Sequence, residues 1–233
     1  MDLGSRLIEE LGVTEVFRVG PVTVTESVVN TWILLVIVLI LCAWLTHGMT
    51  VKNPGRRQLA AESFVLWIER TIKSMLGEKA AKYVYFVITL LIFIAVSNLS
   101  AILETRITSD YTIFKPPTKD LNVTIAMALI SILAVEIAGI RERGVGGWLK
   151  SFSKPMAIIT PINVLEIVIR PLSLCMRLFG NIFGGFIIME ILKLLVPFAV
   201  PIPFSFYFEI FDGLIQAYVF VFLTSIYISE AVE

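Results

Sequence analysis

"PLSLCMRLFGNIFGG", Pro171 to Gly185, decides the fold because it sets an arginine inside an apolar segment. Leucine, methionine, phenylalanine and isoleucine side chains surround Arg177, and no acidic residue lies within ten positions of it. A cation in such a segment requires a partner elsewhere in the fold, a water-filled cavity or a function. The rest of the sequence indicates which of these applies.

The composition indicates a membrane protein. Of the 233 residues 57% are hydrophobic, and the mean hydropathy is +0.88, whereas about half of a soluble domain is apolar. Nineteen basic residues balance nineteen acidic ones, so the net charge gives no sign of nucleic-acid binding. Cys42 and Cys175 lie in apolar runs and His47 is the only histidine, so we expect no disulfide, metal site or cofactor.

Apolar runs long enough to cross a bilayer as a helix, about 20 residues, recur along the chain. We expect an all-α integral membrane protein, with residues 1–233 forming one membrane domain that contains five transmembrane helices. The predicted transmembrane helices cover 28–49, 83–104, 120–141, 159–196 and 203–230. The last two are long and are separated by prolines, which predicts a hairpin of two tilted helices.

The segment 55–80 differs from the spans because apolar and basic residues alternate along it. This pattern predicts an amphipathic helix in the membrane interface, and the alternative is a short helix packed on the others. Basic residues gather in this segment and in the loop 142–158, which places both on the cytoplasmic side. The N-terminal segment 1–27 and the loop 105–119 are then external, and the C-terminus is cytoplasmic.

Small and polar residues recur at separations of three and four along the predicted helix 159–196 and form one stripe. The members of this stripe are Asn163, Glu166, Arg170, Ser173, Arg177, Asn181 and Gly184. Glu166 and Arg170 can neutralise each other as an i,i+4 pair, whereas Arg177 has no such partner. Gly180 and Gly184 remove side-chain bulk, which favours the close approach of another helix.

Further ionisable and amide side chains lie in the apolar segments near the C-terminus. Glu209, Asp212 and Gln216 recur at separations of three and four and are expected to share a face, while Glu190 lies elsewhere on the preceding helix. Ionisable residues at membrane depth are costly and by default mark a pathway.

Structural roles are the alternatives. Arg177 would then bond to carbonyls of a neighbouring helix, Glu209 and Gln216 would form an interhelical hydrogen bond, and Glu190 would reach the outer interface.

The motif "PLSLCMRLFGN", together with "PINVLE", "DLNVTIAMAL" and "IQAYVFVFLTSIYI", resembles subunit a of the rotary F-type ATP synthase of bacterial type. The resemblance covers most of the chain. It implies a stator subunit with two aqueous half-channels that carries H⁺ or Na⁺ to and from the carboxylates of the rotating c-ring. Ion flow is thereby coupled to ATP synthesis or hydrolysis, and no bond is made or broken in this chain.

The resemblance also implies partners and a location. The partners are the c-ring, the b-type peripheral stalk subunits and the remaining synthase subunits, and the location is the bacterial cell membrane. A solute transporter or channel with a substrate-binding intramembrane arginine is the alternative. It would predict repeats or broken helices in both halves, and the sequence shows neither.

Individual roles follow from the resemblance in the same way. Arg177 matches the family's stator arginine, with Asn181 one turn later and Gln216 facing it from the last helix. The resemblance further implies Glu209 in the outer half-channel, and Asn163 and Glu166 near the cytoplasmic exit. Asp212 is a further ion-pathway candidate because it lies one turn from Glu209. The positions expected to face the ring are Ser173, Gly180 and Gly184.

One position departs from the family pattern. Many members carry a glutamate nine residues after the arginine, where this chain has Phe186. Glu190 lies one turn further on the same face, and we expect it to replace the missing carboxylate.

Overall fold

The computed structural model describes residues 15–20, 22–51, 54–102, 114–152, 158, 160–196 and 201–233. Within these ranges the fold is helical apart from one β-hairpin. Five helices are long and apolar enough to cross a membrane, as the sequence predicts. They cover Glu26–Thr46, Arg56–Leu99, Leu121–Ser151, Thr160–Met189 and Pro203–Val232.

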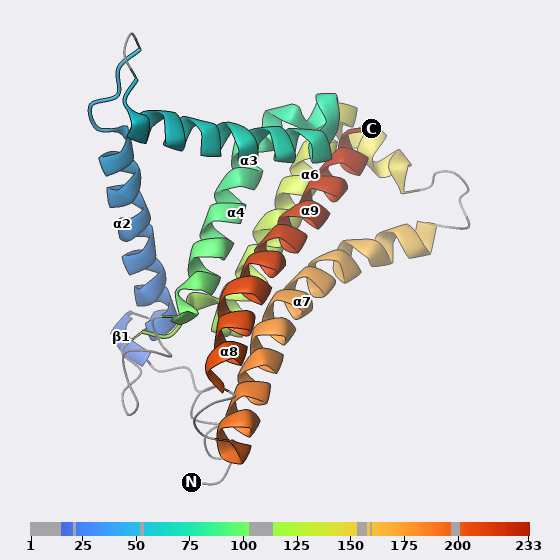
Figure 1. The fold of residues 1–233 in the computed structure, drawn as a ribbon. Coiled ribbons are helices and arrows are strands. Elements are labelled where there is room, and N and C mark those ends of the chain that lie inside the picture. Colours follow the sequence, from blue (N-terminus) through green and yellow to red (C-terminus); the bar gives the residue numbers. More distant parts are fainter. Residues whose placement is uncertain are drawn as a thin grey trace.

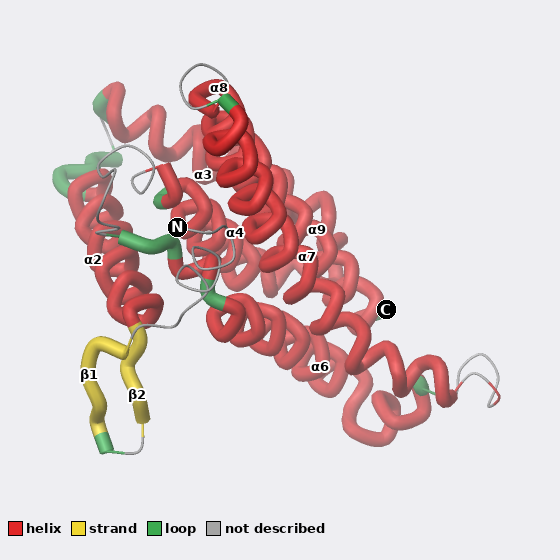
Figure 2. The backbone as a smooth tube through the Cα atoms, turned by 90° about the horizontal axis from the view of Figure 1, so that it is seen from below, coloured by secondary structure: helices red, strands yellow, loops and turns green. Residues whose placement is uncertain are grey.

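Four helices lie side by side and form a bundle (Figure 1). They are α4 (Val84–Leu99), α6 (Leu121–Ser151), α7 (Thr160–Leu195) and α9 (Gly213–Val232). The helix α3 (Arg56–Ala80) crosses one end of this bundle and continues through η1 (Ala81–Tyr83) into α4. The helix α2 (Glu26–Thr46) stands apart on one side, as Figure 1 and Figure 2 both show.

A two-stranded hairpin precedes α2 and was not predicted from the sequence. The strand β1 (Glu15–Val19) pairs antiparallel with β2 (Val22–Thr25), and Val19 lies opposite Val22. Gly20 has a φ of 63°, a conformation that glycine adopts without steric cost and that tight hairpin turns require. The strands are so short that their alternation of apolar and polar residues is not recognisable beside the long apolar runs.

The core of the bundle lies between α4, α6 and α9, and α7 adds the apolar side that bears Leu174 and Leu178. The side chains at its centre include Val87, Ile94, Ile132, Val135, Leu174, Leu178, Phe220 and Val221. Lipid tails are as apolar as these side chains, so close packing and polar contacts decide how tightly such helices associate.

Two glycines with positive φ break long helices. Gly77 (φ 73°) interrupts α3 before its last turn, and Gly144 (φ 69°) interrupts α6. Helix continues after Gly144 to Ser151, inside the segment that the sequence predicts as the loop 142–158. The Trp148 Nε1–H donates to Glu136 Oε2 at 2.7 Å across this break, which holds the short second segment against the end of α6.

The last predicted helix, 203–230, has an internal irregularity. It begins as α8 (Pro201–Phe206), continues as the π-helical turn η4 (Tyr207–Asp212), and ends as α9. Single π-turns inside helices occur frequently at functional sites. The spacing of apolar and polar residues does not predict π-turns, because helical periodicity is judged at 3.6 residues per turn.

The helix α7 is 36 residues long and contains Pro171. Its first half curves away from the bundle, as Figure 1 shows. Proline removes one backbone hydrogen bond and bends a helix, so Pro171 accounts for a bend in the first half of α7. The helix α7 packs against α6, α8 and α9.

Gly213 is a position where the bundle requires glycine. A Cβ at this position would lie 3.1 Å from the Cβ of Asn98 on α4. We expect Gly213→Ala to separate the two helices and to cost about 1–3 kcal/mol by overpacking. Thermal denaturation of the purified protein in detergent measures this as a lower midpoint.

Gly146→Ala is the matched control, because a Cβ there meets no described atom within 4 Å. Equal midpoints for both alanine variants would show that the contact at Gly213 does not limit packing.

Candidate functional site

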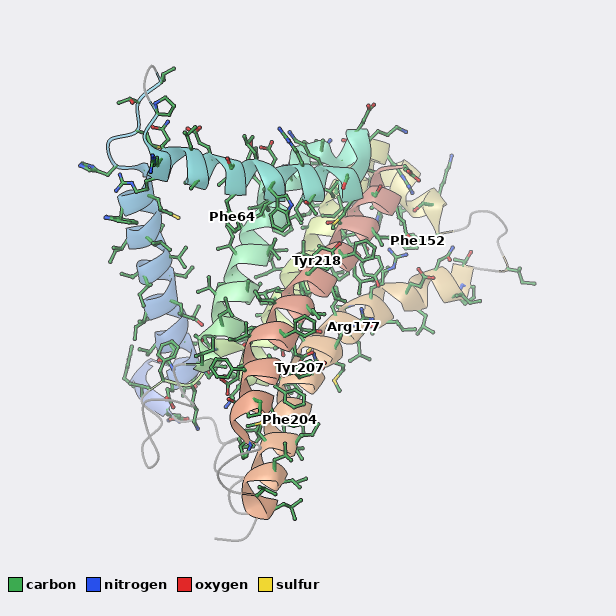
Figure 3. All side chains as sticks on the ribbon, in the orientation of Figure 1. Phe64, Phe152, Arg177, Phe204, Tyr207 and Tyr218 are labelled. Atoms are coloured by element: carbon green, nitrogen blue, oxygen red, sulfur yellow. The ribbon has the colours of Figure 1, made fainter. Side chains whose placement is uncertain are left out.

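Arg177 lies about midway along α7, between the two ends of the bundle that Phe152 and Phe204 mark in Figure 3. Its side chain is exposed, and the exposed residues that precede it on α7 include the apolar Leu172 and Met176. In the described part of the chain no hydrogen bond or ion pair involves Arg177, so no described carbonyl holds it in a structural role. The site therefore starts from a cation on an apolar surface at mid-height.

Residues with small side chains lie close to Arg177 on α7. Ser173 is half-buried one turn before it, and Gly180 is exposed shortly after it. A Cβ on Gly180 or Gly184 would meet no described atom within 4 Å. The three small residues predicted to face a partner helix thus leave space along the same part of α7.

A polar cluster joins α7 to the C-terminal helix one turn beyond Arg177. The Nδ2–H of Asn181 donates to Asp212 Oδ2 at 2.8 Å and to Gln216 Oε1 at 3.4 Å. Gln216 is 5% exposed, and its Nε2 has no hydrogen-bond partner among the described residues. The structure thus brings together three of the predicted site residues, and one buried amide group there still lacks an acceptor.

The π-turn changes the expected relation between the acids of the last helix. Asp212 and Gln216 both reach Asn181, whereas Glu209 is not among its hydrogen-bond partners. Glu209 and Asp212 both lie in η4, where each residue turns through a smaller angle than in an α-helix because the turn is wider. Over the three residues from Glu209 to Asp212, the angle between the two side chains about the helix axis is therefore larger than the α-helical spacing predicts.

Asn98 is a site residue that the sequence analysis missed. Its Nδ2–H donates to the backbone oxygen of Gly213 at 2.8 Å, and its own Oδ1 is buried without a partner among the described residues. Ser97 Oγ on α4 and Thr118 Oγ1 on η2 (Pro117–Lys119) are also buried and unpaired there. The visible signal was the pair Ser97–Asn98 inside an otherwise apolar span.

A buried polar atom without a protein partner is a site where an ordered water molecule can bind, because the dry atom forgoes a hydrogen bond. These atoms belong to α4, η2 and α9, and α4 packs against both of the other elements.

A second polar group lies at the opposite end of α7. The Arg170 guanidinium bonds to Glu166 Oε2 at 2.7 Å, as the spacing predicts, and also to Glu230 Oε2 at 3.1 Å. The Arg143 guanidinium donates to the backbone oxygen of Glu230 at 2.8 Å. The C-terminal Glu230, which the sequence analysis did not include, therefore ties the end of α9 to α6 and α7.

Asn163 lies near this end of the bundle, and its Nδ2–H donates to the Phe152 backbone oxygen at 2.7 Å. Glu190 belongs to α7, but its side chain lies outside the described residues. No group of three His, Cys, Asp or Glu side chains within the described ranges is placed to hold a metal ion.

Comparison with known proteins identifies the relatives of this chain. The family described as "ATP synthase A chain" matches residues 28–229. Subunit a of the ATP synthase of Moorella thermoacetica is 36% identical, over 94% of this chain and 96% of the relative. ATP synthase subunit a 2 of Bradyrhizobium sp. is 35% identical over 94% of each chain. A sodium-ion-specific ATP synthase subunit a from Propionigenium modestum is 30% identical over 91% of this chain and 75% of the relative.

The hydrogen bond between Asn181 and Asp212 generates a test of the cluster. Asp212→Leu removes the acceptor and leaves Asn181 with only its longer contact to Gln216. We expect this variant to lose about 1–3 kcal/mol. Asp212→Asn keeps an acceptor oxygen and is expected to lose less. Urea unfolding of the purified protein followed by tryptophan fluorescence compares the two, and equal losses would show that the bond does not hold the helices together.

Proposed function

The chain belongs to the ATP synthase subunit a family, whose model matches residues 28–229, and from this membership we propose how the chain moves ions. The chain is thus a multi-pass membrane protein and the ion-translocating stator subunit of the membrane sector. It is specific for H⁺ or Na⁺ and works with the other synthase subunits. The proposal concerns the residues that carry the ion and the partner surfaces that they meet.

The membrane orientation follows from charge. The amphipathic α3 crosses the end of the bundle where the C-terminus also lies (Figure 1), and its basic residues include Arg56, Arg57, Arg70 and Lys73. Basic segments favour the cytoplasmic side, and such helices lie in the interface. We place α3 and the C-terminus there, with the hairpin β1–β2 outside and α7 and α9 as a tilted hairpin in the cell membrane.

The exposed, unpaired guanidinium of Arg177 is the observation that carries the proposal. A cation on an apolar surface at mid-depth is costly unless an anion approaches it. We propose that the carboxylates of the c-ring approach it in turn, across the surface formed by Ser173, Gly180 and Gly184. An ion-loaded carboxylate is neutral and can face lipid, whereas a bare one cannot because its charge would be buried.

Arg177 supplies the bare carboxylate with a charge partner, which favours release of the bound ion. Its fixed positive charge also separates the two aqueous half-channels and opposes direct leakage of ions between them. The c-ring then carries each ion around before it leaves by the other path, and b-type stalk subunits hold the stator in place.

The outer half-channel lies between α4, η2, η4 and the outer part of α7. The water indicated by Asn98, Thr118 and Gln216 leads to Asn181 and Asp212, next to Arg177. Glu209 and Glu190 supply carboxylates further out and pass ions towards this cluster. Glu190 takes the place of the carboxylate that Phe186 removes.

The inner half-channel opens at the other end of α7. Asn163 and Glu166 line it, and the bonds from Arg170 to Glu166 and Glu230 fix the position of the Glu166 carboxylate. Family membership favours this mechanism over a solute transporter with a substrate-binding arginine.

Arg177→Ala tests the proposed function. We expect the complex to assemble but ATP synthesis and ATP-driven ion pumping in membrane vesicles to be abolished, because bare ring carboxylates lose their partner. Arg177→Lys should also lose most activity, since an ammonium lacks the planar fork that binds a carboxylate through two hydrogen bonds. Coupled synthesis at the parental rate in Arg177→Ala vesicles would contradict the assignment.

Cysteine crosslinking tests the surface that faces the ring. Ser173→Cys and Gly184→Cys should each form a disulfide with a cysteine on the outer helix of the ring subunit. Val168→Cys is the matched control, because Val168 is 63% exposed and lies nine residues from Arg177, on the opposite side of α7. A higher crosslinking yield from Val168 than from the two stripe positions would show that another face of α7 meets the ring.

A further inference from the structure

A short helical segment lies at the inner end of the bundle, and the mechanism above does not use it. It follows the break at Gly144 and ends at Ser151; Figure 1 shows it in yellow, near the C-terminus. Its residue Trp148 bonds to α6, and the following residue, Phe152, bonds to α7. These two contacts connect an acidic residue of α6 to Asn163, a proposed channel residue of α7.

Glu136 is the acidic residue, and it lies inside the membrane-spanning part of α6. It is half-buried and precedes Gly144 by eight residues, which is about 12 Å along the helix. In the described part of the chain no salt bridge joins a cation to its carboxylate, whereas the Trp148 indole donates to it at 2.7 Å. An ionisable residue at membrane depth is by default functional, and here its partner is a neutral donor.

Trp148 is held against α6 by more than this hydrogen bond. A Cβ on Gly139, one turn after Glu136, would lie 3.5 Å from Trp148 Cδ1, so the indole packs closely on the helix. The Ser151 hydroxyl donates to the Trp148 backbone oxygen at 2.6 Å. Tryptophans of the interfacial belt sit among the lipid headgroups, whereas the indole N–H of Trp148 binds an acid of its own chain. Its role is therefore more specific than that of a lipid anchor.

The same segment orients Asn163. The Phe152 ring meets the Trp148 ring edge to face, with centroids 5.0 Å apart and an interplanar angle of 88°, which is a favourable aromatic geometry. The Phe152 backbone oxygen accepts from Asn163 Nδ2 at 2.7 Å. A hydrogen bond to a carbonyl fixes the plane of an amide, so the position of Phe152 determines the direction of the Asn163 amide.

We propose that Trp148 is a positioning residue of the inner half-channel. Held by the Glu136 carboxylate, it keeps the Phe152 oxygen where that oxygen orients the Asn163 amide in the ion path. This inference rests on the proposed role of Asn163. Glu136 acts in it as a hydrogen-bond acceptor and not as a carrier of ions. Loss of the indole N–H or of its acceptor then slows ion passage while the bundle stays folded.

The test is the rate of ATP synthesis in vesicles that carry the complete synthase, driven by imposed gradients of both H⁺ and Na⁺. Trp148→Phe keeps an aromatic ring and removes the N–H, and we expect the rate to fall about fivefold, as for the loss of one hydrogen bond. Trp67→Phe is the matched control, because it removes the N–H of a tryptophan that is 63% exposed on α3. The control should retain the parental rate, and rates are compared per amount of assembled complex, measured by immunoblotting.

Two variants of Glu136 separate an acceptor from an ion carrier. Glu136→Gln keeps an oxygen that accepts from the indole and should retain the parental rate. Glu136→Leu removes the acceptor and should match Trp148→Phe. If Glu136→Gln slows synthesis as much as Glu136→Leu does, the charge of this residue is required and the inference is overturned.

A double variant shows whether Trp148 acts through Asn163. Asn163→Ala should slow synthesis, and the addition of Trp148→Phe should slow it no further, because both changes disrupt one chain of contacts. A structural role of Trp148 elsewhere in the bundle would instead make the two losses additive, and additive losses would overturn the inference.

Asn163→Ala also separates this inference from a failure of the proposed function. If Asn163→Ala slows synthesis and Trp148→Phe does not, only the role of Trp148 is wrong. If Asn163→Ala leaves synthesis at the parental rate, the assignment of Asn163 to the inner half-channel fails, and the inference fails with it.

Discussion

A positive charge that cannot leave the membrane is the constraint on which the other features depend. Arg177 is exposed on an apolar surface of α7 and has no partner among the described residues. Such a charge is tolerated where an anion or water reaches it. Three features of the structure fit the need for an anion or water near Arg177. They are the small residues beside it, the polar cluster one turn away and the buried unpaired polar atoms of α4 and η2. Each supplies either space for a partner or a place for water.

The contacts that hold the bundle together also lie along the ion path that we propose. Between helices in lipid, close approach at small residues and polar contacts replace the hydrophobic drive of a soluble core. Asn98 donates to the Gly213 carbonyl, and Gly213 leaves space for the Asn98 side chain. Gly185 receives the Phe208 ring in the same way. The π-turn between these two contacts sets the direction of Asp212 and Glu209, so helix packing and the proposed ion path share the same few residues.

Much of this architecture is predictable because bilayer thickness dictates helix length. The five long helices and the pair Glu166–Arg170 follow from hydropathy and helical spacing. The family resemblance implies that Gln216 faces Arg177, whereas the described contacts of Gln216 join it to Asn181. The break at Gly144, the π-turn and the β-hairpin do not, since each is a local departure from regular periodicity. Glu230 and Asn98 acquire their roles only from helices distant in sequence. Similarly, the hydrogen bond from Trp148 to Glu136 depends on how the segment after Gly144 packs, which periodicity does not encode.

If the Arg177 charge separates two half-channels, the passive leakage of ions through a stalled synthase must depend on this residue. In vesicles that carry the complete synthase, absence of nucleotide keeps the soluble sector still and prevents ring rotation. An imposed proton gradient should then persist in parental vesicles, because no ion can pass the arginine without the ring. We expect Arg177→Ala vesicles to dissipate this gradient while their ring is stationary. Arg177→Ala vesicles that remain as proton-tight as the parental ones would contradict this expectation.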